Sequence, residues 1–287
     1  MKFHYSDLIT KGEFHLVMHE TTFDRLFFQR DFKDEFLTIA WNKGPKQIVT
    51  IDEVPYDFPE QGVLPMMINQ SFRFEKPEQV VAWQYNRNFY CIIDHDREVS
   101  CVGFLFYGST GMMFIDLNEH EQHKIDQLLA VFIDEFQTAD NIQKDMLMML
   151  LKRLVIILTR LAKKQYVNDP RLTDDKLDIA RQYNLLVENH YHKQHYVQFY
   201  ADQLHKSPKT LANLFALYNQ KSPLAIIKER IVLEAKRLLI YTDKSAKEIA
   251  YYLGFEDTAY FSNFFKKHTS HSPLDFRHTK TTFPSGQ

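Results

Sequence analysis

Residues 244–277 constrain the fold of this chain most, because they predict two short helices joined by a tight turn. Ser245 and Glu248 form an S-x-x-E capping box, which predicts a helix that starts at about residue 246. Gly254 predicts the end of that helix, since glycine adopts the left-handed C-cap conformation at low cost. Asp257 can then accept a hydrogen bond from the first free N–H groups of a second helix. This arrangement, with a polar and basic outer face on the second helix, is typical of a helix-turn-helix unit.

The same pattern occurs a second time, upstream, in residues 196–222. Phe215 and Phe265 occupy equivalent positions in the two copies and lie 50 residues apart. A single copy would fit an ordinary helical hairpin, whereas an internal duplication favours two DNA-reading units. We therefore predict helix-turn-helix units at residues 197–217 and 245–268, joined by a helix at residues 223–241.

These motifs resemble the AraC/XylS family of bacterial transcription regulators. The resemblance covers residues 178–278, and its most specific part is GFEDTAYFSNFFKK, which begins at Gly254 and is followed by Ser272-Pro273 and Phe276-Arg277. It implies an α+β multidomain chain, with an all-α double helix-turn-helix domain at residues 179–279. In front of it, the resemblance implies a cupin-like β-barrel with added helices at residues 1–167, which serves as sensor and dimerisation domain.

The outward positions of the two reading helices are the candidates for DNA contact. Asn213 and Asn263 each offer a donor and an acceptor, which suits an adenine edge, and Lys209 suits a guanine. Flanking lysines suit phosphates, which set register and affinity rather than sequence. A solvated surface charge is the alternative for each lysine. The predicted DNA-binding set is Lys206, Ser207, Lys209, Thr210, Ala212, Asn213, Lys221, Lys247, Thr258, Ala259, Ser262, Asn263, Lys266 and Lys267.

Charge is distributed unevenly along the chain. Residues 1–169 hold 18 Lys and Arg against 25 Asp and Glu, whereas residues 170–287 hold 17 against 12. The C-terminal part is therefore basic although the whole chain carries a formal net charge of −2. A basic C-terminal part is consistent with phosphate binding.

Residues 1–115 read as β-rich, because short apolar or alternating runs are separated by turn-forming residues. The predicted strands are residues 14–18, 36–41, 47–51, 62–68, 71–74, 89–93 and 101–107. Such a pattern predicts a barrel or a sandwich. An interior lined by aromatic side chains would suit a small-molecule effector, with plain core packing as the alternative; the candidates are Trp41, Tyr56, Phe58, Trp83, Tyr85 and Phe106.

No metal site, cofactor or catalytic residue is predicted. His15, His19 and His95 are scattered, whereas an enzymatic cupin holds its metal with closely spaced histidines and a carboxylate. A cupin-fold metalloenzyme with a helical C-terminal extension is therefore the less favoured alternative to a regulator. His190, His192 and His195 are interpreted as a solvated helix end.

A helical hairpin is predicted at residues 119–165, followed by a polar interdomain linker at residues 168–178. In its second helix five apolar residues step by three and four, as in a coiled-coil seam. The resemblance places the family's dimer contact in this region, so a homodimer is expected, with internal packing as the alternative. The seam consists of Leu147, Leu150, Leu154, Ile157 and Leu161.

The remaining sequence features concern the cellular compartment and the partners that we expect for the protein. Cys91 and Cys101 are the only cysteines, which fits reduced thiols in the cytoplasm rather than a disulfide framework. No segment reads as a signal peptide or a membrane span. The expected partners are double-stranded DNA, a second copy of the chain, a small-molecule effector and, for an activator, RNA polymerase. Gln220 and Ser270 stand where the family usually has glycine after each reading helix, which predicts local strain.

Overall fold

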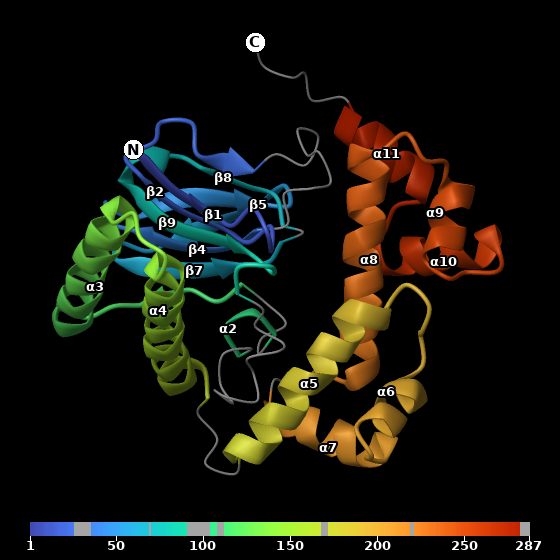
Figure 1. Ribbon diagram of the computed structural model, residues 1–287. Coiled ribbons are helices and arrows are strands. Elements are labelled where there is room, and N and C mark those ends of the chain that lie inside the picture. The colour runs from blue at the N-terminus through green and yellow to red at the C-terminus, as the bar shows by residue number, and fades with distance from the viewer. Residues whose placement is uncertain are drawn as a thin grey trace. The chain divides into compact units, whose positions relative to one another are not determined.

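The chain forms two compact units, residues 1–168 and residues 169–287, each with its own core (Figure 1). The computed structural model describes residues 1–25, 36–68, 70–90, 104–107, 112–167, 172–218 and 221–281. Cys91 and Cys101 lie outside these ranges. None of the helices within them is long and apolar enough to cross a lipid bilayer.

The first unit contains two β-sheets among its described residues. The larger has the strand order β1-β2-β9-β4-β7-β10 and the smaller has the order β3-β8-β5-β6. All the pairs between neighbouring strands are antiparallel. The strands are β1 (Lys2–Ser6), β2 (Glu13–Met18), β3 (Asp24–Arg25), β4 (Phe36–Asn42), β5 (Gln47–Ile51), β6 (Val54–Phe58), β7 (Gly62–Met66), β8 (Phe72–Phe74), β9 (Val80–Asn86) and β10 (Ile115–Asp116).

The larger sheet is buried on both faces. On one face Ala40 and Ala82 join a core with Val49 and Phe58 of the smaller sheet. On the other face the ring of Trp83 lies 6.0 Å from that of Phe132 in α3 (Glu119–Gln137). α3 packs beside α4 (Gln143–Tyr166), and both helices lie next to the sheets in Figure 1.

The sequence prediction was wrong for the described parts of two strands and missed several others. Residues 104–107, the described part of the predicted strand 101–107, form the short helix α2 (Phe104–Tyr107). Phe89 and Tyr90 of the predicted strand 89–93 follow β9 in a turn. The prediction missed β1, β3, β6, β10 and the central strand β9. β9 reads VVAWQYN, without the alternation that marks a half-exposed strand, because helices and sheet cover both its faces.

The second unit is all-helical. Its helices are α5 (Asp174–His190), α6 (Val197–Gln203), α7 (Pro208–Tyr218), α8 (Pro223–Tyr241), α9 (Ala246–Tyr252), α10 (Thr258–Thr269) and α11 (Pro273–Thr281). α8 runs through the unit, with α5 and α7 packed near one end and α9, α10 and α11 near the other (Figure 1). α5 begins at Asp174, so residues 174–178 of the predicted linker are helical.

Candidate nucleic-acid interface

The second helix-turn-helix pair, α9 and α10, has the caps that its sequence specifies. Ser245 accepts a hydrogen bond from the backbone of Glu248, and the Glu248 carboxylate accepts one from the backbone of Ser245 at 2.7 Å. Gly254 has φ +78° in the turn, which favours glycine. Asp257 accepts a hydrogen bond from the backbone N–H of Ala259 at 2.8 Å. The capping box therefore fixes where α9 starts, and the Asp257 bond fixes where α10 starts.

The two faces of α10 differ in the way a reading helix requires. Phe261 and Phe265 are fully buried, whereas Asn263 is exposed. The other predicted contacts surround Asn263: Ala259, Lys266 and Lys267 are exposed, and Thr258 and Ser262 are half-buried. All of them therefore lie on or beside the outer face of α10.

The first reading helix, α7, has the same division. Leu211, Leu214 and Phe215 are buried, and the exposed side chains near its N-terminal end are Lys209, Thr210, Ala212 and Asn213. Two of the predicted DNA contacts, Ser207 and Thr210, also bond to each other at the start of α7. The Ser207 hydroxyl accepts from the Thr210 N–H at 3.0 Å and pairs with the Thr210 hydroxyl at 2.8 Å.

The flanking lysines differ in their surroundings. Lys206, Lys266 and Lys267 are exposed. Lys221 forms an ion pair with Glu229 at 2.8 Å, and a phosphate would have to compete with that carboxylate. Lys247 is exposed, and its ammonium lies 6.0 Å from the ring centroid of Tyr251.

A buried ionic network joins α5 to α8. The Arg230 guanidinium donates to Glu188 of α5 at 2.7 Å and to Glu234 at 2.9 Å, and it lies 3.9 Å from the Tyr191 ring centroid. Burial opposes the charge on Arg230, but Glu188, Tyr191 and Glu234 together outweigh it and raise the guanidinium pKa. Arg230 therefore stays charged and holds α5 on α8.

The loop between α5 and α6 touches the turn of the second helix-turn-helix pair. His195 Nε2 lies 2.8 Å from the carbonyl oxygen of Leu253, and its ring centroid lies 4.8 Å from that of Phe255. A carbonyl oxygen only accepts, so His195 Nε2 donates to it, and burial lowers the pKa of the His195 ring. The prediction of a solvated helix end was therefore wrong. All three histidines are half-buried; His190 packs on Phe199 and His192 stacks on Tyr252.

Residues 200–279 match the model of a family described as a helix-turn-helix domain. The second unit contains an AraC-type helix-turn-helix domain.

Among curated proteins, the chain is similar to transcriptional activators. It is 27% identical over 135 residues to the HTH-type transcriptional activator RhaS of Salmonella arizonae. The aligned region covers 47% of this chain and 46% of that protein. It is 30% identical over 91 residues to RhaS of Salmonella newport, and this aligned region covers 32% of this chain and 33% of that protein. The chain thus spans half or less of the length of these relatives.

Two solved structures represent the structural neighbours. The DNA-binding domain of AdpA in complex with a target DNA is 28% identical, covers 38% of this chain and 97% of its own, and superposes with a TM-score of 0.34. ToxT from Vibrio cholerae is 14% identical, covers 97% of both chains, and superposes with a TM-score of 0.41.

Ser270 gives the AraC-type domain a left-handed C-cap without glycine. It follows α10 with φ 66° and ψ −1°, and its N–H donates to the carbonyl of Lys266 at 2.8 Å. The sequence prediction of a strained non-glycine residue agrees with this backbone conformation. Gln220, the equivalent position after α7, lies outside the described residues.

The six aromatic candidates for effector binding do not share one interior. Tyr56 and Phe58 face the core between the two sheets, where both rings lie near Phe114. Trp83 faces α3 instead, and strand register puts Trp41 on the same side. The other two are Tyr85, which packs on Phe14 next to Phe132, and Phe106, which is buried in α2.

The predicted dimer seam packs inside the first unit. Leu147, Leu150, Leu154 and Leu161 are buried within the chain itself, and Ile157 is half-buried. Burial of these side chains by α3 and the sheet leaves them little surface for a second copy. The outer side of α4 is different: Met149 is 67% exposed, and the groove beside it is lined by Lys124, Lys152, Arg153, Ile156, Ile157 and Arg160.

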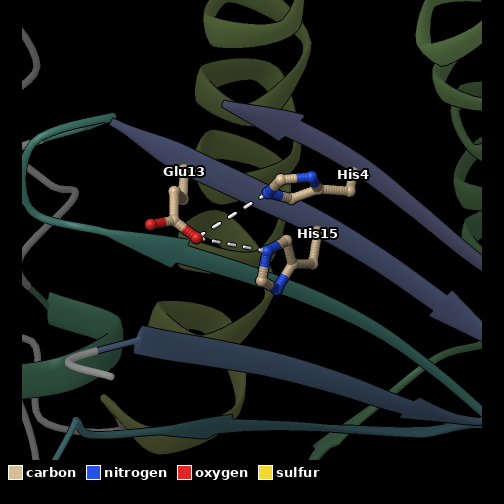
Figure 2. A group of neighbouring side chains, drawn as sticks. All are labelled: His4, Glu13 and His15. Carbon is tan, nitrogen blue, oxygen red and sulfur yellow. Dashed lines mark ion pairs between the residues drawn. The ribbon is translucent and has the colours of Figure 1, made fainter. Parts of the chain in front are cut away.

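One group of side chains among the described residues has the composition of a metal site, although the sequence predicted none. His4 of β1 and Glu13 and His15 of β2 converge across the pairing of these two strands (Figure 2). Sequence reasoning named His15 but not its neighbours, because only the pairing of the two strands brings them together.

Proposed function

We propose that the protein is a sequence-specific DNA-binding transcription regulator. The observation that carries this proposal is the pair of capped helix-turn-helix units, whose reading helices bury their apolar face and expose a polar N-terminal face. The match of residues 200–279 to a helix-turn-helix domain supports it.

In this proposal α7 and α10 enter successive major grooves on one side of the duplex. α8, with 19 residues, is about 28 Å long at 1.5 Å per residue. Successive major grooves repeat at about 34 Å. In this proposal the helix-turn-helix pairs at the two ends of α8 span the distance by which the groove repeat exceeds the length of α8. One chain would then read two short boxes separated by one helical turn.

The exposed side chains suggest how each box is read. Asn213 and Asn263 suit the donor and acceptor of an adenine edge, Lys209 suits a guanine, and the methyl groups of Ala212 and Ala259 suit a thymine methyl. The proposed set contains no arginine, so it lacks the strongest guanine contact. We therefore expect DNA shape to contribute to specificity.

The roles of the first unit belong to the same proposal. A cupin-like sensor would bind a small-molecule effector next to Tyr56 and Phe58, because these two candidates face the core between the sheets. A homodimer would use the outer side of α4, where Met149 is exposed. Regulation of this kind takes place in the cytoplasm and, for an activator, involves RNA polymerase. We assign no catalytic residue, since the matched relatives are regulators.

The test compares three variants on a binding site selected from random duplexes. Asn263→Ala should lower affinity for that site by about 1–3 kcal/mol and relax the preference at one base. Lys266→Ala should weaken all sequences about equally and reduce the salt slope by about 1. Lys76→Ala removes an exposed lysine from the first unit, away from the groove beside Met149, and is the matched control. If Asn263→Ala changes neither affinity nor base preference, α10 does not read DNA as proposed.

A further inference from the structure

Strand pairing brings two histidines and a glutamate to one point. β1 and β2 are antiparallel, and His4 pairs directly with His15, while Glu13 precedes His15 by two residues. Alternate residues of a strand share a face, so Glu13, His15 and the core residue Val17 point to the same side of the sheet. Side chains that are directly opposite or diagonal on two strands are within reach of each other.

The distances suit a shared ligand atom or ion. Glu13 Oε2 lies 3.7 Å from His4 Nε2 and 3.6 Å from His15 Nε2, as the dashed lines in Figure 2 mark. The three ligand atoms lie within 4.8 Å of one another. A tetrahedral zinc ion with bonds of about 2.0–2.1 Å holds its ligands about 3.3–3.5 Å apart. Small side-chain movements would therefore close the site.

The three side chains differ in mobility in a way that favours closure. His15 is buried, and its ring centroid lies 4.7 Å from that of Phe36, so packing fixes its orientation. The side chains of His4 and Glu13 are 48% and 41% exposed, so both can adjust around an incoming ion. A fixed ligand with two adjustable ones gives the site an entry path from solvent.

We propose that His4, Glu13 and His15 bind a divalent transition-metal ion of the zinc class. Two imidazole nitrogens and one carboxylate oxygen are a ligand set that such ions prefer, and three protein ligands leave a fourth position open to water or an anionic donor. Two neutral imidazoles and one carboxylate compensate one of the two positive charges, which favours an anionic fourth ligand. This site is independent of the proposed DNA reading.

Metal binding would tie two strands together at the edge of the larger sheet. The Arg25 guanidinium donates to the carbonyl oxygen of Phe36 at 2.7 Å, so the residue that packs on His15 is itself held by β3. A bound ion would therefore rigidify the β1–β2 edge of the sheet, where the ring of Phe36 in β4 packs on His15. The competing explanation is that Glu13 only forms ion pairs with histidine, with no ion involved.

The experiment titrates the full-length, tag-free protein with Co²⁺ after treatment with a chelator. Wild type should bind one equivalent and show visible bands of a tetrahedral or five-coordinate ion, without the thiolate charge-transfer band that Cys91 or Cys101 would give. His4→Gln and Glu13→Gln should each weaken binding at least about 10–100-fold, the effect of losing even an outer-shell partner. His120→Gln removes an exposed histidine from α3 and should leave binding unchanged.

A second measurement does not depend on variants. Zn²⁺ should raise the unfolding temperature of the wild-type protein further as its concentration rises above the dissociation constant. It should also protect the exposed His4 ring from modification by diethyl pyrocarbonate. The proposal would be overturned if the wild type did not bind Co²⁺, or if His4→Gln and Glu13→Gln bound Co²⁺ as tightly as the wild type does. Either result would leave the ion-pair explanation.

Discussion

Replacing Gly254 by alanine should destabilise the second unit by disturbing the turn of its second helix-turn-helix pair. Gly254 has φ +78°, and a Cβ atom built on it would lie 2.5 Å from the carbonyl oxygen of His192. It would also lie 3.4 Å from Nε2 of His195, the atom that bonds to Leu253. The substitution therefore combines backbone strain with a collision against backbone.

The expected loss follows from three contributions. A left-handed conformation costs a residue with a Cβ about 1–2 kcal/mol, and overpacking against a backbone carbonyl costs about 1–3 kcal/mol. The smaller conformational freedom of unfolded alanine offsets about 0.4–1 kcal/mol. We expect a net loss of about 2–4 kcal/mol. Gly254→Asn keeps the collision but tolerates the left-handed region better, so it should cost about 1 kcal/mol less.

The two units can be followed separately during urea unfolding. Both tryptophans, Trp41 and Trp83, lie in the first unit, so tryptophan fluorescence reports on that unit alone. Circular dichroism at 222 nm follows the helices of both units, so the part of its transition that fluorescence does not follow belongs to the second unit. Gly254→Ala should shift only that part to lower urea concentration. A loss below about 1 kcal/mol for both variants would refute the reasoning. Equal losses would show that the collision, not the backbone strain, sets the effect.

Three further substitutions test other parts of the structure. Ser270→Gly should stabilise the second unit by up to about 1 kcal/mol in the same urea assay, because φ 66° strains serine more than glycine. Arg230→Met should destabilise the second unit in that assay by less than the about 3–5 kcal/mol typical of a fully buried pair, because it removes the cation that half-buried Glu188 and Glu234 share while Arg237 still lies 3.7 Å from Glu234. Adding Glu188→Met should recover part of the loss. Asp7→Asn should lower the unfolding temperature of the first unit at neutral pH, since the hydrogen bond from Lys144 lowers the Asp7 carboxyl pKa. That stabilisation is present above the carboxyl pKa of the unfolded chain, so the difference between the two proteins should disappear as the pH falls well below it.

Local features of the second unit could be predicted because short-range chemistry determines them. The capping box of Ser245 and Glu248, the cap by Asp257 and the turn at Gly254 each depend on residues within a few positions. The phenylalanines that α10 buries also follow from helical spacing alone.

Features that depend on distant segments could not be predicted in the same way. α4 is apolar on more than one side, and periodicity does not tell which side α3 and the sheet cover, so the seam was assigned to side chains that are buried. His195 meets Leu253 across 58 residues, and no local pattern signals that contact. The approach of His4 to His15 depends on the register of β1 and β2, and β1 itself was missed.

Two connections of different kinds set the relation between the two reading helices. α8 is a single rod, and a rod fixes the distance between the pairs at its ends more firmly than their rotation about its axis. The contact of His195 with Leu253 and Phe255 lies off that axis, between the entry to the first pair and the turn of the second. An off-axis contact resists rotation, because rotation must break it. The close fit of Gly254 against His192 belongs to the same contact, so that glycine serves both the turn of one pair and the orientation of the other.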